Sequence, residues 1–192
     1  MRAVLALLAL LTAPAPYPAL AQEAAAPPTL VLPASLPPEV AEAILARPDR
    51  FADLAADLIH GHGTGGAIAP AAIETAIALD RAYFRARALR PFLEADLDAD
   101  GTLQAPEIAA RAATLSTTGR ARLMRQQTDA DADSDGTITP AELSRHAEAA
   151  VARASRPQDE ALLRAVAIFD ANTDGTASLA EIAQAMQTVA PD

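Results

Sequence analysis

The stretch Asp96-Leu-Asp-Ala-Asp-Gly-Thr-Leu-Gln-Ala-Pro-Glu107 decides the fold of this chain, because its twelve-residue pattern occurs three times. The second copy is Asp131-Ala-Asp-Ser-Asp-Gly-Thr-Ile-Thr-Pro-Ala-Glu142, and the third is Asp170-Ala-Asn-Thr-Asp-Gly-Thr-Ala-Ser-Leu-Ala-Glu181. Each copy has short oxygen-bearing side chains at positions 1, 3 and 5, glycine at position 6 and glutamate at position 12. Alternate residues of a tightly wound loop point inward, so the short side chains converge on one point. A single copy is compatible with a solvated turn, but three copies in register indicate a cation site.

This pattern resembles the calcium loop of the EF-hand family, and the resemblance covers roughly residues 48–190. It implies a helix on each side of every loop and three bound Ca²⁺ ions. It also implies that the ligands are the side chains at positions 1, 3, 5 and 12 and the backbone carbonyl at position 7. Gln104, at position 9 of the first loop, would act through water. Thr139 and Ser178 occupy position 9 in the second and third loops. The implied ligands are Asp96, Asp98, Asp100, Thr102 and Glu107 in the first loop, Asp131, Asp133, Asp135, Thr137 and Glu142 in the second, and Asp170, Asn172, Asp174, Thr176 and Glu181 in the third.

A fourth segment fits the same spacing. The three loops start at residues 96, 131 and 170, and a step of 35 residues back from Asp96 places residues 61–72 in the loop frame. Gly66 then takes position 6 and Ile68 takes position 8, but no ligand position holds a carboxylate. We interpret this glycine loop as an EF-hand that has lost its metal, with a glycine-rich linker as the alternative.

Four hands imply two pairs, joined by a short antiparallel bridge at loop position 8. We expect Ile68 to pair with Leu103 and Ile138 to pair with Ala177. The sequence therefore predicts an all-α fold made of two pairs of EF-hands, 39–110 and 111–192, with the first hand degenerate.

Local signals support helices beside the loops. Thr139-Pro-Ala-Glu142 and Ser178-Leu-Ala-Glu181 are capping boxes, and Pro140 suits the first position of a helix. Pro91 interrupts the helix that enters the first loop and is expected to kink or start it.

The N-terminal part predicts export. Arg2, an apolar run from Ala3 to Leu11 and the small residues of Ala19-Leu-Ala21 are typical of a secretory signal peptide over residues 1–21. Cleavage would follow Ala21 and release a periplasmic or secreted protein, with no stable membrane insertion. A retained anchor is the alternative. Residues 22–38 are rich in proline and alanine and are expected to form a linker.

Charge and composition exclude other classes. The formal net charge is −10, and loss of residues 1–21 removes Arg2 and no acid, which gives −11. The acidic excess matches the carboxylates of the three loops. This balance argues against nucleic acid as a partner, because binding phosphates needs a basic face. The chain has no cysteine and no recognisable catalytic signature, so we expect no enzyme.

Two smaller features leave alternatives open. His60 and His62 allow a transition-metal site, although further ligands are absent nearby. The cluster of Arg81, Arg85, Arg87 and Arg90 allows a phosphate or lipid-headgroup site, or a solvated face that balances acids such as Asp80 and Glu94. The third histidine, His146, is expected to be a partly exposed surface residue.

The sequence favours an exported calcium-binding protein with a structural or buffering role. The alternative is a calcium sensor that recruits an unknown protein partner through a groove opened by calcium. Sensor grooves tend to be rich in methionine. Beyond residue 21 the chain has only Met124 and Met186, and it has no tryptophan, which favours the structural or buffering role.

Overall fold

The computed structural model describes residue 30 and residues 32–187, so the predicted signal peptide and most of the predicted linker lie outside the described residues. The described chain is helical, with one two-stranded sheet and one short 3-10 helix. The prediction of an all-α fold is therefore confirmed. The helices are α1 (Pro38–Ala46), α2 (Pro48–His62), α3 (Pro70–Leu93), α4 (Ala105–Ala113), α5 (Thr117–Ala130), α6 (Pro140–Ala154), α7 (Pro157–Ala165) and α8 (Leu179–Met186), with η1 at Val166–Phe169 and strands β1 (Ala67–Ile68) and β2 (Ala177–Ser178).

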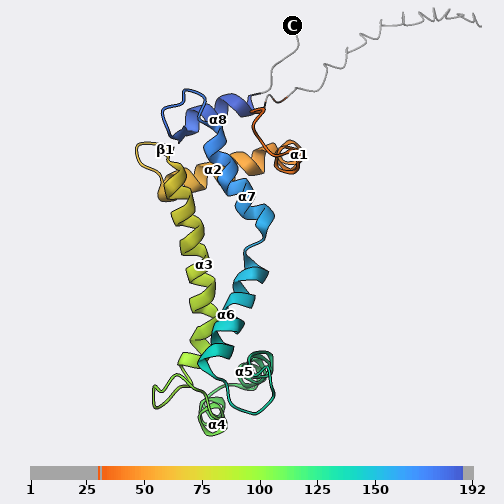
Figure 1. Cartoon of the computed structure of the whole chain (residues 1–192), viewed down its shortest axis with the longest axis vertical. Coiled ribbons are helices and arrows are strands. Elements are labelled where there is room, and N and C mark those ends of the chain that lie inside the picture. Colours follow the sequence, from red (N-terminus) through yellow and green to blue (C-terminus); the bar gives the residue numbers. More distant parts are fainter. Residues whose placement is uncertain (1–29, 31, 188–192) are drawn as a thin grey trace, which may run out of the picture.

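The molecule is elongated, with a lobe at each end of two long helical segments (Figure 1). One segment is α3, and the other is α6 followed by α7. The lobe that contains α1, α2 and α8 is called the terminal lobe here. The lobe that contains α4, α5, the end of α3 and the start of α6 is called the middle lobe.

The loops pair differently from the sequence prediction. Ile68 pairs with Ala177 in the β1–β2 ladder, and Leu103 forms a bridge with Ile138 through two 2.9 Å hydrogen bonds. The expected partners, Ile68 with Leu103 and Ile138 with Ala177, are wrong. The division into consecutive pairs, 39–110 and 111–192, is therefore not how the loops pair.

The length of α3 explains this pairing. It is one helix of 24 residues, which at 1.5 Å per residue spans about 36 Å. The glycine loop and the first loop lie at its two ends, so they are too far apart to form a bridge. Pro91 lies inside the last turn of α3, so the expectation that it starts a helix is wrong. The second and third loops are separated in the same way by α6 and α7 (Figure 1).

Each lobe has its own hydrophobic core. In the terminal lobe, Phe51 and Phe169 pack with ring centroids 5.2 Å apart, and Ile44 and Val166 are fully buried. In the middle lobe, the core surrounds Phe92. Because the two ends of α3 face different cores, its apolar residues follow no single stripe along the whole helix.

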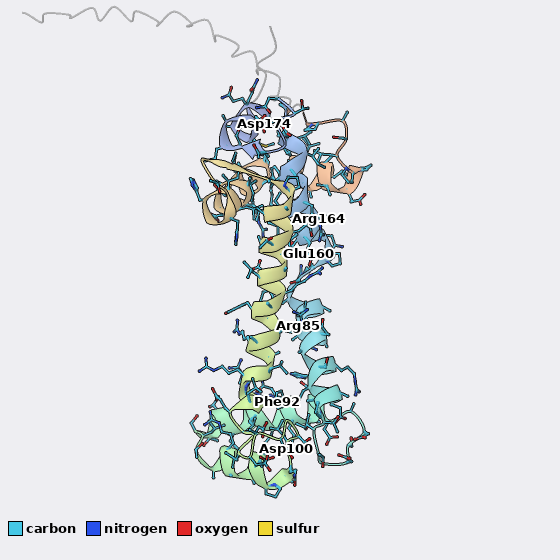
Figure 2. All side chains as sticks on the ribbon, turned by 60° about the vertical axis from the view of Figure 1, so that its left-hand side comes forward. Arg85, Phe92, Asp100, Glu160, Arg164 and Asp174 are labelled. Carbon is cyan, nitrogen blue, oxygen red and sulfur yellow. The ribbon has the colours of Figure 1, made fainter. Side chains whose placement is uncertain are left out.

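Ion pairs connect the long helices between the two cores. Arg81 on α3 donates two hydrogen bonds, of 2.8 and 2.7 Å, to the buried carboxylate of Glu160 on α7. Arg164 on α7 donates to both Glu160 and Glu74, and Arg85 on α3 pairs with Glu148 on α6. Figure 2 shows Arg85, Glu160 and Arg164 along the connection between the lobes. No helix of the described residues has the length and apolar character needed to cross a membrane.

Candidate metal centres

The three predicted loops wind in the same way. Position 4 has a positive φ in each loop, at Ala99, Ser134 and Thr173, with values of 60°, 60° and 57°. The position-6 glycines, Gly101, Gly136 and Gly175, also have positive φ, a conformation that is costly for residues with a Cβ. The repeated sequence pattern thus has one repeated backbone path, which turns the alternate side chains inward.

In the first two loops this path brings the carboxylates together. One ligand-capable oxygen from each of Asp96, Asp98 and Glu107 lies within 4.8 Å of the other two. Asp131, Asp133 and Glu142 form an equivalent cluster in the second loop. Two carboxylates about 4 Å apart repel by about 4 kcal/mol at an effective dielectric of 20, so each cluster favours a bound cation.

The position-1 aspartates provide the most specific sign of a cation site. Oδ2 of Asp96 accepts the N–H of Gly101 at 3.1 Å, and Oδ2 of Asp131 accepts the N–H of Gly136 at 3.0 Å. The other oxygen, Oδ1, is buried in both residues and has no hydrogen-bond partner. Buried polar atoms normally have a partner, and Ca²⁺ prefers carboxylate oxygen, so the donor set fits calcium.

The position-12 glutamates hold the two ends of their loops together. Oε1 of Glu142 accepts the N–H of Ala132 at the start of the loop, and Oε2 accepts the N–H of Thr139 at its end, both at 2.9 Å. These bonds, with a further one from the Thr139 hydroxyl, lower the pKa of Glu142 to about 2. Backbone bonds from Gln104 and Leu97 also lower the pKa of Glu107. Both glutamates are therefore ionised at neutral pH, as calcium binding requires.

These glutamates also begin the helices that follow. Thr139 accepts the N–H of Glu142 and caps α6, which begins at Pro140. Ser178 and Glu181 form the same reciprocal cap at the start of α8. The two predicted capping boxes are confirmed, and each couples a candidate ligand to the direction of a helix.

The third loop is arranged differently around its acids. Oδ1 of Asp170 accepts the N–H of Asp174 at 3.1 Å, so neither of its oxygens is left without a partner. Asp174 also accepts bonds from the Thr176 hydroxyl and the Asn172 amide, and these hydrogen bonds lower its pKa. Within the described residues, three carboxylates meet within 4.8 Å only in the first and second loops. The third loop has the expected residues, but more of its oxygens are bonded within the loop.

The remaining predicted ligands line the same loops. Asp100 and Asp135 are exposed, and each accepts the backbone N–H of the threonine at position 7, Thr102 or Thr137, at 2.7 Å. Thr176 donates its N–H to Asp174 in the same way, at 2.8 Å. Figure 2 shows Asp100 and Asp174 in loops at opposite ends of the molecule.

The glycine loop is shorter than its twelve-residue frame. Helix α2 continues to His62, so Gly61 belongs to a helix and not to the loop. Gly65 and Gly66 have φ values of 64° and 81° and form a tight turn between Thr64 and Ala67. No carboxylate lies in this turn, which provides β1 as the partner strand of the third loop.

The basic cluster on α3 is mostly neutralised. Arg81 pairs with Glu160, Arg85 with Glu148 and Arg90 with Glu94, so three of the four charges are balanced, although Glu94 is the only one of the two expected acids that takes part and Glu160 is buried. Two of the partners lie on other helices, which the sequence did not indicate. Arg87 forms no ion pair within residues 32–187.

The three histidines differ in their surroundings. His60 and His62 lie exposed at the end of α2, and neither joins a group of three potential metal ligands among the described residues. His146 is partly exposed, as expected, and its ring also packs edge-on against Phe92 with a centroid distance of 5.2 Å. No sequence pattern relates these two positions.

Residues 129–145 match the family model described as EF hand. This segment contains the whole second loop and the beginning of α6. No curated protein and no solved structure shows a significant match to the chain. The loop geometry and the family match agree that this segment is similar to an EF hand, and the EF-hand family is generally of a calcium-binding, non-enzymatic type. The resemblance inferred from the sequence is thereby confirmed for this segment.

Proposed function

We propose that the protein binds three calcium ions, one in each of the first, second and third loops. The observation that carries this proposal is the buried, unpartnered Oδ1 of Asp96 and Asp131 inside a cluster of carboxylates. The proposal includes the third loop because its sequence and its backbone path repeat those of the other two loops. The glycine loop is the fourth hand and binds no metal.

The proposed role is that of a calcium-stabilised structural or buffering module. Binding to the folded state alone stabilises it by about 2.7 kcal/mol per site when free calcium exceeds the dissociation constant by about a hundredfold. The carboxylates of an empty loop repel one another, so calcium removes a destabilising term as well. Without cysteine, the chain draws its stability from its two cores and from these sites.

Export belongs to the same proposal and is supported by residues 1–21 of the sequence. None of the three loops has an acid at position 9, which is consistent with sites of moderate affinity. Extracellular modules of this class bind with dissociation constants of about 10⁻⁴–10⁻³ M. Sites of micromolar or weaker affinity would remain occupied in a compartment rich in calcium.

A calcium sensor is the second candidate, and one observation favours it. A groove of about 590 Å³ begins in the middle lobe and continues along α3 and α6, and residues of α3, α4, α5 and α6 line it. Helices α4 and α6 contain Glu107 and Glu142 in their first turns, so occupation of the two loops would act directly on two walls of the groove. A partner bound there would then respond to calcium.

Native mass spectrometry and titration calorimetry of the full chain test the number of sites. We expect three ions at saturation. Replacing Asp131 with Asn should reduce the number to two under conditions that saturate the remaining loops. Asp129→Asn makes the same charge change two residues earlier, outside the loop, and should leave three. A stoichiometry of four, or of two or fewer for the unaltered protein, contradicts the assignment.

A further inference from the structure

We propose that the groove in the middle lobe binds an acidic, partly apolar segment of a partner protein. Four helices contribute its walls: α3, α4, α5 and α6. Five guanidinium groups and one carboxylate lie along it. These residues are Arg87 and Arg90 on α3, Glu94 directly after it, Arg111 on α4, Arg122 on α5 and Arg153 on α6.

The single carboxylate neutralises only part of this charge. Glu94 accepts a hydrogen bond of 2.9 Å from Arg90 and another from Arg111, so it is shared between two guanidiniums. Arg87, Arg122 and Arg153 have no ion-pair partner among residues 32–187. They are also exposed, so they are accessible to carboxylates from outside. The groove is therefore a local excess of positive charge on a chain whose net charge is −10.

The floor of the groove is apolar. Phe84 and Leu115 are half-buried there, and Leu123, with 4% of its surface exposed, connects the floor to the core around Phe92. Tyr83, which is 58% exposed, lies one helical turn before Arg87 on the same side of α3 and extends the apolar surface along that helix. A fitting occupant thus combines apolar side chains with carboxylates at their edges, as an amphipathic acidic helix does.

The surroundings favour a protein segment over other polyanions. The first and second loops, which belong to the same lobe, carry eight carboxylates among their ligand positions. An extended anionic surface such as a membrane or a nucleic acid would meet these acids together with the arginines and would be repelled. A short acidic segment can occupy the concave groove without crossing the loops.

Calcium should strengthen this binding, an expectation that rests on the proposed function. Two ions in the first and second loops would offset four negative charges in the lobe that contains the groove. They would also fix the positions of α4 and α6, because Glu107 and Glu142 lie in the first turns of these helices. An acidic ligand would then be less repelled and would meet better-ordered walls.

The test is calorimetry of the full chain with a designed peptide of about 16 residues that has leucines on one helical face and glutamates on the other. A second peptide with lysines in place of the glutamates serves as the comparison. With calcium at saturation we expect one acidic peptide to bind per chain and to shift the NMR signals of Phe84 and Leu123. The basic peptide should leave those signals unchanged. No binding of the acidic peptide, or equal shifts with both peptides, overturns the proposal.

Matched charge reversals localise the site. Arg122→Glu and Arg153→Glu should each weaken binding of the acidic peptide roughly tenfold, since a favourable charge contact becomes a repulsive one. Arg125→Glu and Arg145→Glu change the net charge equally on the same two helices, but neither residue lines the groove, so each should weaken binding far less. Equal losses in all four variants would mean a general electrostatic effect and would overturn the groove as the site.

Two further readouts separate this proposal from the calcium assignment. If three ions bind and the acidic peptide does not, the groove proposal fails alone. If fewer ions bind while the peptide still binds through Arg122, the calcium stoichiometry fails and the groove remains. Sedimentation of the chain without peptide tests whether a second copy of the chain occupies the groove. If the chain forms a dimer that Arg122→Glu dissociates, the proposal that a partner segment binds there is overturned.

Discussion

Ile68 pairs with Ala177 in an antiparallel ladder, which places the carboxylate-free glycine loop beside the third loop in the terminal lobe. Leu103 and Ile138 make the equivalent bridge in the middle lobe, between the first and second loops. The middle lobe therefore has two candidate calcium sites that share a bridge, and the terminal lobe has one candidate site whose partner loop offers no ligand. We therefore expect the first and second loops to respond to each other and the third loop to respond alone.

Replacing Glu142 with Gln should weaken calcium binding at the second loop roughly tenfold or more, since the ionised position-12 side chain supplies two oxygens. Through the Leu103–Ile138 bridge it should also weaken the first loop, while the third loop changes little. Site-resolved NMR titration with calcium measures all three. Glu181→Gln is the matched control and should affect the third loop alone. An effect of Glu142→Gln on the third loop as large as that on the first would contradict the observed pairing.

Gly63→Ala should destabilise the terminal lobe. A Cβ at this position would lie 2.5 Å from the carbonyl oxygens of Ile59 and Ala67, so the backbone between α2 and β1 would have to shift. We expect a loss of about 1–3 kcal/mol in the free energy of unfolding, measured by urea denaturation. Gly61→Ala is the control: it lies within α2 with no atom near the added Cβ, and should stabilise by about 0.5–1 kcal/mol. Equal effects in the two variants would contradict the close approach at Gly63.

Glu160→Gln should weaken the connection between the two long helices. The buried carboxylate accepts bonds from both Arg81 and Arg164, and an amide can replace only part of this interaction. Because both arginines are nearly half-exposed, we expect a loss of only about 1–3 kcal/mol. Glu148→Gln breaks the exposed pair with Arg85 and should cost less than about 1 kcal/mol. Urea denaturation of both variants makes the comparison, and a larger loss at Glu148 would be inconsistent with this account.

His146 should make the stability of the middle lobe depend on pH. Burial against the lobe, with a contribution from Arg153, lowers the pKa of His146, while Asp129 raises it. The unfolded chain, with a histidine pKa of about 6.5, therefore binds the proton more readily than the folded chain. The stability that neutral His146 contributes to the folded lobe should be fully present above a pH of about 6.5, and it should decrease as the pH falls below this value.

The measurement compares urea denaturation of the unaltered chain and His146→Gln across this pH range. The variant should lose the part of the pH dependence that begins near 6.5. His60→Gln, at an exposed position on α2, should retain it. An NMR titration that places the folded pKa of His146 above its usual value would reverse the expected sign.

The sequence by itself determined the local structure of this protein. Positions 1, 3, 5, 6 and 12 of each loop predicted both the turn and the converging oxygens, because these features depend on residues within twelve positions of one another. The caps at Thr139 and Ser178 were predictable for the same reason, since each involves a residue three positions further along the chain. The absence of carboxylates from the glycine loop could also be read directly.

Only the tertiary structure decided which loops meet and which charges neutralise one another. The sequence does not state that α3 continues through Pro91 to Leu93, and that continuity separates the glycine loop from the first loop by the length of the helix. The partners of Arg81 and Arg85 come from α7 and α6, and the groove arginines come from four different helices. Packing between distant segments follows from how whole helices fit together, so no local spacing in the chain specifies it.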